Sequence, residues 1–148
     1  MRELPFETAN PGATVEEISA LESCFHFHMP KDIKEFFLKH NGAVFPAGTQ
    51  FDSEHCKLSH FYSIGHQYQQ HIPTINQLLD WQKMDELIPI CYIPFCSDEA
   101  NSSYYVRVDE EGYGKIYYIV DFLDNPDIEG VGLIADNFFA FLEQIDFL

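Results

Sequence analysis

The sequence is poor in positive charge. Its 148 residues contain 8 Lys and Arg against 24 Asp and Glu, which gives a formal net charge of -16. Because nucleic-acid binding depends on Lys and Arg side chains that displace counterions from phosphates, this deficit argues against a nucleic-acid partner. A protein with a basic surface is the better match for the charge, although an acidic balance also serves solubility without any partner.

The acidic excess is uneven along the chain. Residues 1–74 hold 5 basic and 9 acidic side chains, a net charge of -4, whereas residues 75–148 hold 3 and 15, a net charge of -12. The second half of the chain therefore produces most of the negative field.

Long apolar runs are also missing. No run approaches the roughly 20 apolar residues that span a bilayer, and the first residues, MRELPFETANPG, contain no apolar signal-peptide core. The cysteines imply no disulfide framework: they are Cys24, Cys56, Cys91 and Cys96. We therefore expect a cytoplasmic protein with reduced thiols and no membrane partner.

Recognisable catalytic and cofactor motifs are absent too. The sequence has no Gly-x-Ser-x-Gly, no glycine-rich phosphate loop and no dinucleotide-binding glycine pattern. Cys–His pairs and neighbouring carboxylates such as Asp98 and Glu99 carry little weight in a chain with 7 His and 24 acidic residues, because chance produces them. We predict a protein that is not an enzyme and has no cofactor.

The histidines raise the question of a metal site. The spacing of the candidate ligands fits no closed zinc pattern. These candidates are Glu54, His55, Cys56, His60, His66 and His71. We predict no metal, and a metal-dependent or thiol enzyme is the least favoured alternative.

Apolar and aromatic residues, by contrast, are plentiful. Hydrophobic residues make up 46% and aromatic residues 16% of the chain, which is enough to offset the conformational entropy lost on folding. A compact domain of this length buries roughly 68–70% of the surface that its unfolded chain exposes. We predict a single domain over residues 1–148, with residues 1–13 as an extended leader.

Helix signals occur in four segments. The residues suited to begin these helices are Thr14 (with Glu17 in a capping box), Pro30, Thr74 and Asp136. The second helix is expected to end at Asn41-Gly42, which tolerate the left-handed C-terminal conformation. The apolar positions expected to face the core are Val15, Ile18, Leu21, Phe25, Ile33, Phe36, Phe37, Ile75, Leu78, Leu79, Phe138, Phe139, Leu142 and Ile145.

The middle of the chain is rich in β signals. Candidate strands lie at about 49–52, 57–64, 87–95, 103–109 and 115–121, flanked by turn residues. The runs SSYYVRV and KIYYIV alternate on either side of residues 109–114, which predicts an antiparallel hairpin. Because strands cluster between helices without βαβ alternation, the predicted class is α+β: a mainly antiparallel central sheet of about five to six strands, with helices from both chain ends packed against it.

The order of these features resembles a known family. In TVEEISALESCFHFHMPKDIKEFFLKHNG, residues 14–42, a helix with an acidic first turn and Glu22 on its far side precedes Met29-Pro30 and a helix ending in Phe37-Leu38 and Asn-Gly. This pattern resembles the opening of the SUKH superfamily, specifically its Smi/Knr-type branch.

The resemblance continues along the chain to about residue 146. The segments IPFCSD, residues 93–98, and IADNFFAFLEQI, residues 134–145, are similar to the family's apolar-Pro-Phe segment and closing helix. Three positions depart from the family pattern, since Met29, Ala43 and Ala100 stand where the family has Leu, Gly and Gly.

The resemblance implies a binding function. Members of this superfamily are chiefly regarded as cytoplasmic immunity proteins of bacterial toxin systems, which inhibit a specific toxin, often a nuclease, by direct association. A minority are eukaryotic regulators or scaffolds, and a shared fold does not decide between these roles. We expect an immunity protein against a cognate toxin with a basic cleft, as in polymorphic toxin and contact-dependent inhibition systems, with a non-enzymatic scaffold or regulator as the alternative.

The candidate partner-binding residues are acidic side chains at predicted strand ends and loops, with one tyrosine. Such side chains reach solvent without disturbing the core, and their field can accelerate encounter with a basic cleft by about 10 to 10³-fold at low salt. Tyrosine adds apolar area with a polar tip. The candidates, expected to form one acidic face, are Asp98, Glu99, Asp109, Glu110, Glu111, Tyr113, Asp121, Asp124, Asp127 and Glu129. A solvated rim without a partner is the alternative.

Overall fold

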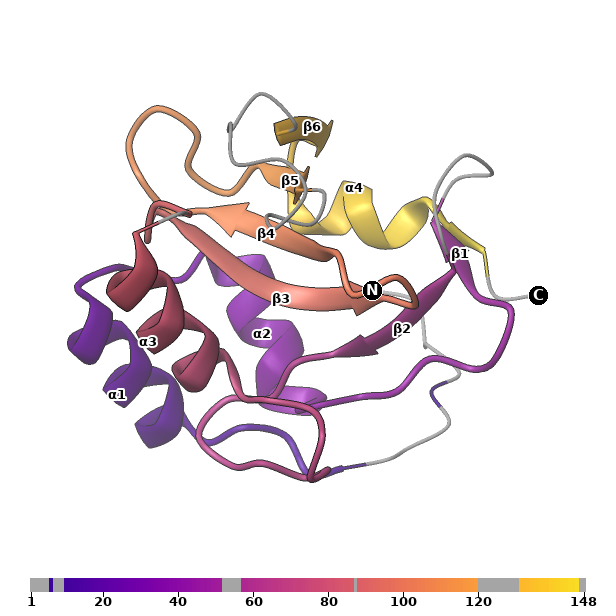
Figure 1. Cartoon of the computed structure of the whole chain (residues 1–148), viewed down its shortest axis with the longest axis horizontal. Helices are drawn as coiled ribbons and strands as arrows, with labels where there is room; N and C mark the ends of the chain where they lie inside the picture. The colour runs from indigo at the N-terminus through magenta and orange to yellow at the C-terminus, as the bar shows by residue number, and fades with distance from the viewer. Residues whose placement is uncertain (1–5, 7–9, 52–56, 87, 120–130, 147–148) are drawn as a thin grey trace.

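The computed structural model describes residues 6, 10–51, 57–86, 88–119 and 131–146 (Figure 1). Its helices are α1 (Val15–Phe25), α2 (Lys31–Lys39), α3 (Ile75–Asp85) and α4 (Phe138–Glu143). Its strands are β1 (Gln50–Phe51), β2 (Leu58–Phe61), β3 (Tyr92–Asp98), β4 (Ser103–Arg107), β5 (Ile116–Ile119), β6 (Val131–Ala135) and β7 (Ile145–Asp146).

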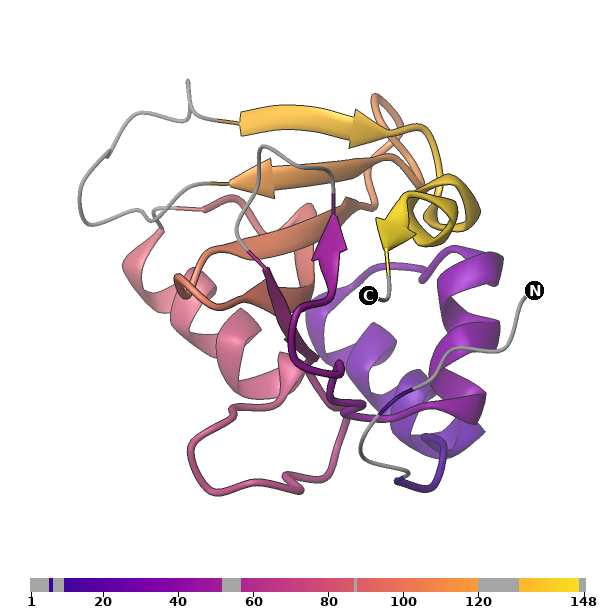
Figure 2. The same ribbon diagram turned by 90° about the vertical axis from the view of Figure 1, so that its right-hand side faces the viewer.

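The described strands form an antiparallel five-stranded sheet in the order β2-β3-β4-β5-β6. Strands β1 and β7 pair separately, also antiparallel, in a two-stranded sheet. Figure 2 shows α4 beside α2, with α3 at a distance from both. This arrangement confirms the predicted α+β class, and the hairpin predicted around residues 109–114 joins β4 to β5.

Local side-chain hydrogen bonds begin two of the helices. At the start of α1, the Thr14 hydroxyl accepts from the Glu17 N–H at 3.0 Å, and the Glu17 carboxylate accepts from the Thr14 N–H at 3.0 Å. Thr74 and Gln77 make the same reciprocal pair at the start of α3. Both predicted helix starts are confirmed, because each capping box satisfies two backbone donors that the helix itself leaves free.

The helix that follows Pro30 ends earlier than predicted. It stops at Lys39, two residues before Asn41. Of the pair Asn41-Gly42, only Gly42 adopts a left-handed conformation, with φ of 70°. Asn41 is buried, where its side chain accepts from the Ile64 N–H at 2.7 Å and donates to the Ile64 carbonyl at 3.1 Å. Asn41 therefore holds a distant segment instead of closing its own helix.

The C-terminal helix is shorter than predicted. Asn137, not Asp136, caps α4, since its side-chain oxygen accepts from the Ala140 N–H at 2.7 Å. Ile145 lies beyond the end of the helix, in β7, although it is still buried.

Some positions differ from the predicted core and strand pattern. Val15 and Phe139 were expected to face the core, but both are exposed. Strand β3 begins at Tyr92 instead of about residue 87, after a turn in which the Tyr92 N–H donates to the Pro89 carbonyl. Strands β6 and β7 were not predicted.

Aromatic side chains fill the space between the sheet and the helices α2 and α4. The ring centres of Phe36 and Phe61 are 4.7 Å apart, and those of Phe36 and Phe138 are 5.0 Å apart. Phe95 of β3 meets Phe141 of α4 at 5.3 Å, nearly edge to face. Tilted and edge-to-face pairs of this kind stabilise a core beyond their apolar area.

A second, smaller apolar cluster is built from strand side chains that point to the other face of the sheet. It is formed by Ile88, Tyr92, Tyr105 and Ile119. On β4, Tyr104 belongs to the main core and its neighbour Tyr105 to this small cluster. Successive side chains of a strand point to opposite faces, so both faces of the sheet carry buried aromatic residues.

Candidate functional site

The hairpin between β4 and β5 carries most of the described candidate residues. Arg107, at the end of β4, donates to both oxygens of Asp109, at 2.7 Å and 2.9 Å, and to Glu111 at 3.1 Å. These hydrogen bonds from Arg107 lower the pKa of the Asp109 carboxyl below its usual value. Two of the predicted binding acids are therefore already engaged within the hairpin.

The shape of the hairpin depends on the Arg107 side chain. Its guanidinium carbon lies 5.4 Å from the centre of the Tyr92 ring on the neighbouring strand, a cation–π arrangement. A Cβ atom at Gly112 would stand 2.5 Å from the Arg107 Cδ, so a larger residue would displace the arginine. The Gly112 N–H also donates to Asp109 at 3.2 Å. Glycine and arginine together fix how the acidic turn is presented.

Glu110 and Tyr113 are two further exposed residues of the hairpin, and Arg107 contacts neither of their side chains in a hydrogen bond. Glu110 is exposed and makes no hydrogen bond or ion pair with the described residues. Tyr113 is half-exposed, and its hydroxyl donates to the His28 carbonyl at 2.8 Å. Burial, followed by the negative charges of Glu22 and Asp32, raises the pKa of Tyr113. The tyrosine thus ties the hairpin to the segment between α1 and α2.

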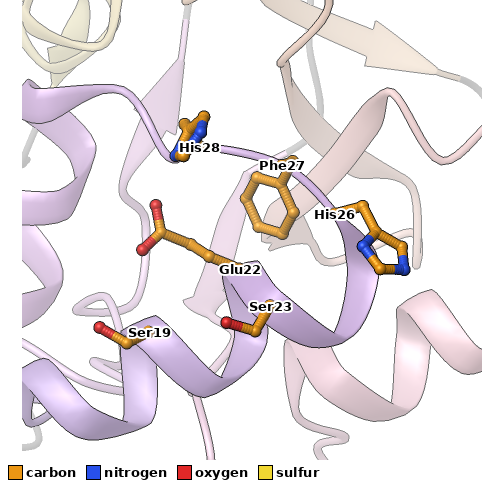
Figure 3. A pocket seen from close by; sticks show the side chains of 6 residues that line it. All are labelled: Ser19, Glu22, Ser23, His26, Phe27 and His28. Carbon is orange, nitrogen blue, oxygen red and sulfur yellow. The ribbon is translucent and has the colours of Figure 1, made fainter.

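That connecting segment borders an open cavity of about 450 Å³ (Figure 3). The cavity is lined by Ser19, Glu22, Ser23, His26, Phe27 and His28. The Glu22 carboxylate accepts from the Met29 N–H at 2.8 Å and lies 3.6 Å from the Lys34 ammonium. Glu22, which carries part of the resemblance noted above, therefore holds the connector in place. Figure 3 shows His26 and His28 on opposite sides of Phe27, so they do not converge on one ligand position.

The remaining described candidates lie in the turn between β3 and β4. Glu99 is exposed, as expected, but the expectation that Asp98 reaches solvent is wrong, because Asp98 is 1% exposed. Its carboxylate accepts from the N–H groups of Ala100 and Ser102, at 2.9 Å and 3.0 Å, and from the Tyr118 hydroxyl at 2.6 Å. A buried carboxylate must be hydrogen-bonded in this way to be tolerated.

The structure separates the two acidic turns that it describes. They stand at opposite ends of β4, whose five residues extend roughly 17 Å at about 3.4 Å each. The expected single acidic face is therefore divided between two ends of the sheet. Asp121, Asp124, Asp127 and Glu129 lie outside the described residues. The residues that flank their segment, Ile119 and Val131, pair with each other, and Ile119 also pairs with Ser103 at the end of β4 nearest Glu99.

A surface that sequence reasoning did not single out lies on α3. Trp81 and Met84 are exposed there, opposite the buried Ile75 and Leu79. The signal was present in the sequence, because helical periodicity sets positions 81 and 84 away from the apolar stripe that faces the core.

Metal chemistry finds little support within the described part of the chain. No group of three or more His, Cys, Asp and Glu side chains is arranged there to hold a metal ion. Glu54, His55 and Cys56, three of the ligands considered from sequence, lie outside the described residues. His60 is largely buried, with Nδ1 2.9 Å from the Ser59 hydroxyl. No helix of the described part is both long and apolar enough to cross a bilayer.

Comparison with known proteins assigns a family. The family model described as SMI1 / KNR4 family (SUKH-1) matches residues 12–144 of the chain. A search of curated proteins finds no matching relative. The match includes both helices of the N-terminal motif, the hairpin and α4.

Proposed function

Because the chain belongs to the SMI1 / KNR4 family (SUKH-1), we propose that it is an immunity protein that binds and neutralises a cognate bacterial toxin. The family is known broadly for immunity and toxin-related roles. In this proposal the protein acts stoichiometrically in the cytoplasm, without catalysis, and its target is a nuclease with a basic active-site cleft. The observation that carries the proposal is the family match over residues 12–144.

The charge of the chain supports a basic target. A nuclease cleft presents Lys and Arg to phosphates, and a formal net charge of -16 produces an attractive field toward such a cleft. Exposed carboxylates that enter the cleft replace the phosphates as partners of these cations. The negative charge of the inhibitor also repels nucleic acid, so the inhibitor does not itself bind the substrate of the toxin.

The exposed part of the acidic hairpin is the proposed contact. Arg107 already satisfies Asp109, and a basic partner would have to displace it to use that carboxylate. Glu110 has no such internal partner to displace among the described residues, and only one carboxylate oxygen of Glu111 contacts Arg107. Tyr113 stands beside them as a half-exposed aromatic side chain whose position is fixed by its hydrogen bond to His28. Glu110, Glu111 and Tyr113 are therefore the leading contact residues.

Other candidates take secondary parts in the proposal. Glu99 and the acids of residues 121–129 contribute to the field, and we propose that they contact the toxin as well. Asp98 is buried, so its role in binding is to hold the β3–β4 turn in shape.

Co-expression with the toxin domain encoded beside this chain's gene tests the proposal. Wild-type protein is expected to restore growth of cells that produce the toxin. Glu110→Gln with Glu111→Gln should weaken this rescue, as should amide replacement of the acids in residues 121–129. Glu35→Gln with Glu143→Gln, two exposed glutamates on α2 and α4, is the matched control and should rescue fully. A wild-type chain that gives no rescue would favour the scaffold or regulator function instead.

A further inference from the structure

Two large apolar side chains stand exposed on the outer side of α3. Trp81 is 52% exposed and Met84 is 78% exposed. They are three residues apart in a helix, so they lie on one side, while Ile75, Leu79 and Gln82 are buried on the other. Burial of a tryptophan removes a large apolar area from water, so its exposure is costly unless a partner covers it.

Carboxylates border this apolar pair. Asp80 is exposed and precedes Met84 by four residues, and Asp85 is exposed and follows Trp81 by four, which makes each acid a surface neighbour of one apolar side chain. Lys83 points elsewhere, toward a groove of about 210 Å³ that it shares with Glu86 and residues 88–90. The Trp81 face, defined as Asp80, Trp81, Met84 and Asp85, is thus apolar at its centre and acidic at its rim.

The buried side of α3, opposite the Trp81 face, packs against the end of the sheet that carries the acidic hairpin. From the last turns of α3, the Gln82 amide donates to the carbonyl of Tyr92, the first residue of β3, at 3.0 Å. The preceding residue, Cys91, accepts from the Val108 N–H at 2.8 Å, directly before the hairpin. Figure 1 shows the end of α3 and the loop between β4 and β5 at the same side of the molecule, and Figure 2 shows them separated across the width of the sheet. A partner that spans this end of the sheet can therefore contact both.

The chemistry of the rim decides between occupants. A second copy of the chain would bring its own carboxylates and a net charge of -16 against the same rim. Anionic lipid and nucleic acid are disfavoured for the same reason. A protein surface that offers Lys or Arg around an apolar hollow satisfies both the centre and the rim of the Trp81 face.

We propose that the Trp81 face is the apolar anchor through which this protein holds a basic partner, the cognate toxin, with Trp81 inserted into a hollow beside the toxin's cationic groups. This inference rests on the proposed function and deepens it. Tryptophan, with Tyr and Arg, is enriched among the interface positions that dominate binding energy, and a rim that excludes water accompanies such positions. The acidic hairpin steers the toxin, and Trp81 slows its dissociation.

The test compares two exposed aromatic residues on different helices. Trp81→Ala should raise the Kd for the toxin domain encoded beside the gene by about 30-fold or more, mainly through faster dissociation. Met84→Lys, at a site too exposed to threaten folding, should weaken binding by placing a positive charge against a basic surface. Phe139→Ala is the control, because Phe139 is 54% exposed on α4, away from α3 in Figures 1 and 2, and should leave Kd unchanged.

A spectroscopic readout locates the contact directly. Trp81 is the single tryptophan of the chain, so fluorotryptophan labelling gives a single fluorine resonance. Addition of unlabelled toxin domain should shift that resonance, whereas raising the concentration of the labelled protein alone should not. If the toxin binds but Trp81→Ala, Met84→Lys and Phe139→Ala all retain wild-type Kd, the anchor is disproved while the proposed function stands. If wild-type protein does not bind the toxin, both are disproved, and a shift caused by the protein alone would assign the face to a second copy.

Discussion

The carboxylate of Asp98 accepts a hydrogen bond of 2.6 Å from the hydroxyl of Tyr118, which links the end of β3 to β5 across the intervening strand β4. The same carboxylate accepts from two N–H groups of the β3–β4 turn. The buried side chain of Asp98 therefore fixes both the conformation of the β3–β4 turn and the distance of this turn from β5.

Replacement of Asp98 by alanine should destabilise the protein strongly. Asp98→Ala removes three hydrogen bonds to the carboxylate and takes this acceptor from the buried Ser102 N–H, so we expect a loss of about 3 kcal/mol in the free energy of unfolding. Asp98→Asn keeps one acceptor oxygen and should lose about half as much. Urea denaturation measures both. Glu99→Ala, at the exposed neighbouring position, should change stability by less than about 0.5 kcal/mol; equal losses at the two positions would contradict the assignment.

Glu22 is expected to stabilise the connector between α1 and α2. Glu22→Ala leaves the buried Met29 N–H without its acceptor and should cost about 1–3 kcal/mol of unfolding free energy. Glu22→Gln retains an acceptor oxygen and loses only the Lys34 contact at 3.6 Å, so it should cost less than about 1 kcal/mol. Thermal and urea unfolding of both variants check the order, and a Gln variant as unstable as the Ala variant would show that charge, not the hydrogen bond, matters.

The features of the fold that sequence predicted correctly are those set by neighbouring residues. Thr14 and Thr74 lie three residues from the Glu and Gln that complete their capping boxes, so local spacing sufficed. The hairpin between β4 and β5 was predictable because its two strands are close in the sequence and alternate, and the residues between them include turn-forming glycines. By contrast, β7 has two residues and pairs with β1, where Gln50 lies opposite Asp146, and no local pattern records a pairing between residues so far apart in the sequence.

The expectation that Asp98 reaches solvent failed for the same physical reason. A turn acid is normally solvated, and only the contact with Tyr118, which lies 20 residues away in the sequence, makes Asp98 a buried acceptor. The pairing of Arg107 with Asp109 depends on how a glycine turn folds back over the strand, which composition does not reveal. Among the described candidates, the exposed acids are therefore Glu99, Glu110 and Glu111.

Substitution of Gly112 should release Asp109 from Arg107. A methyl group at Gly112 would stand 2.5 Å from the Arg107 Cδ, which is too close, so the arginine must move and its hydrogen bonds to Asp109 weaken. Since those bonds lower the pKa of Asp109, the pKa should rise toward 3.8 in Gly112→Ala. Carboxyl titration by NMR measures this shift. Gly132→Ala, where an added Cβ meets no atom within 4 Å, is the control, and an unchanged Asp109 pKa in Gly112→Ala would contradict the prediction.

His60 should make the protein less stable as pH falls below 6.5. Burial, followed by the charge of His71, lowers the pKa of His60 from 6.5 to about 4. Between these values the unfolded chain binds a proton that the folded chain does not, so unfolding becomes more favourable by up to about 3 kcal/mol. Urea denaturation from pH 7 to pH 4.5 measures the slope for wild type and His60→Gln. The slope should be shallower in the variant, and parallel slopes would exclude His60 as the cause.

Association with the toxin should depend on where negative charge lies as well as on how much is present. Glu110→Gln with Glu111→Gln, and Glu35→Gln with Glu143→Gln, each remove two negative charges from the chain, but only the first pair lies in the proposed contact. At low ionic strength the first pair should slow association several-fold and the second only slightly, because nearby charges act most strongly. Exposed charges are screened beyond about 8 Å at physiological salt, so the difference should narrow as salt rises. Stopped-flow association rates at several salt concentrations measure this. Equal slowing by both pairs would mean that the net field alone attracts the toxin, and the hairpin would then lose its role as the contact.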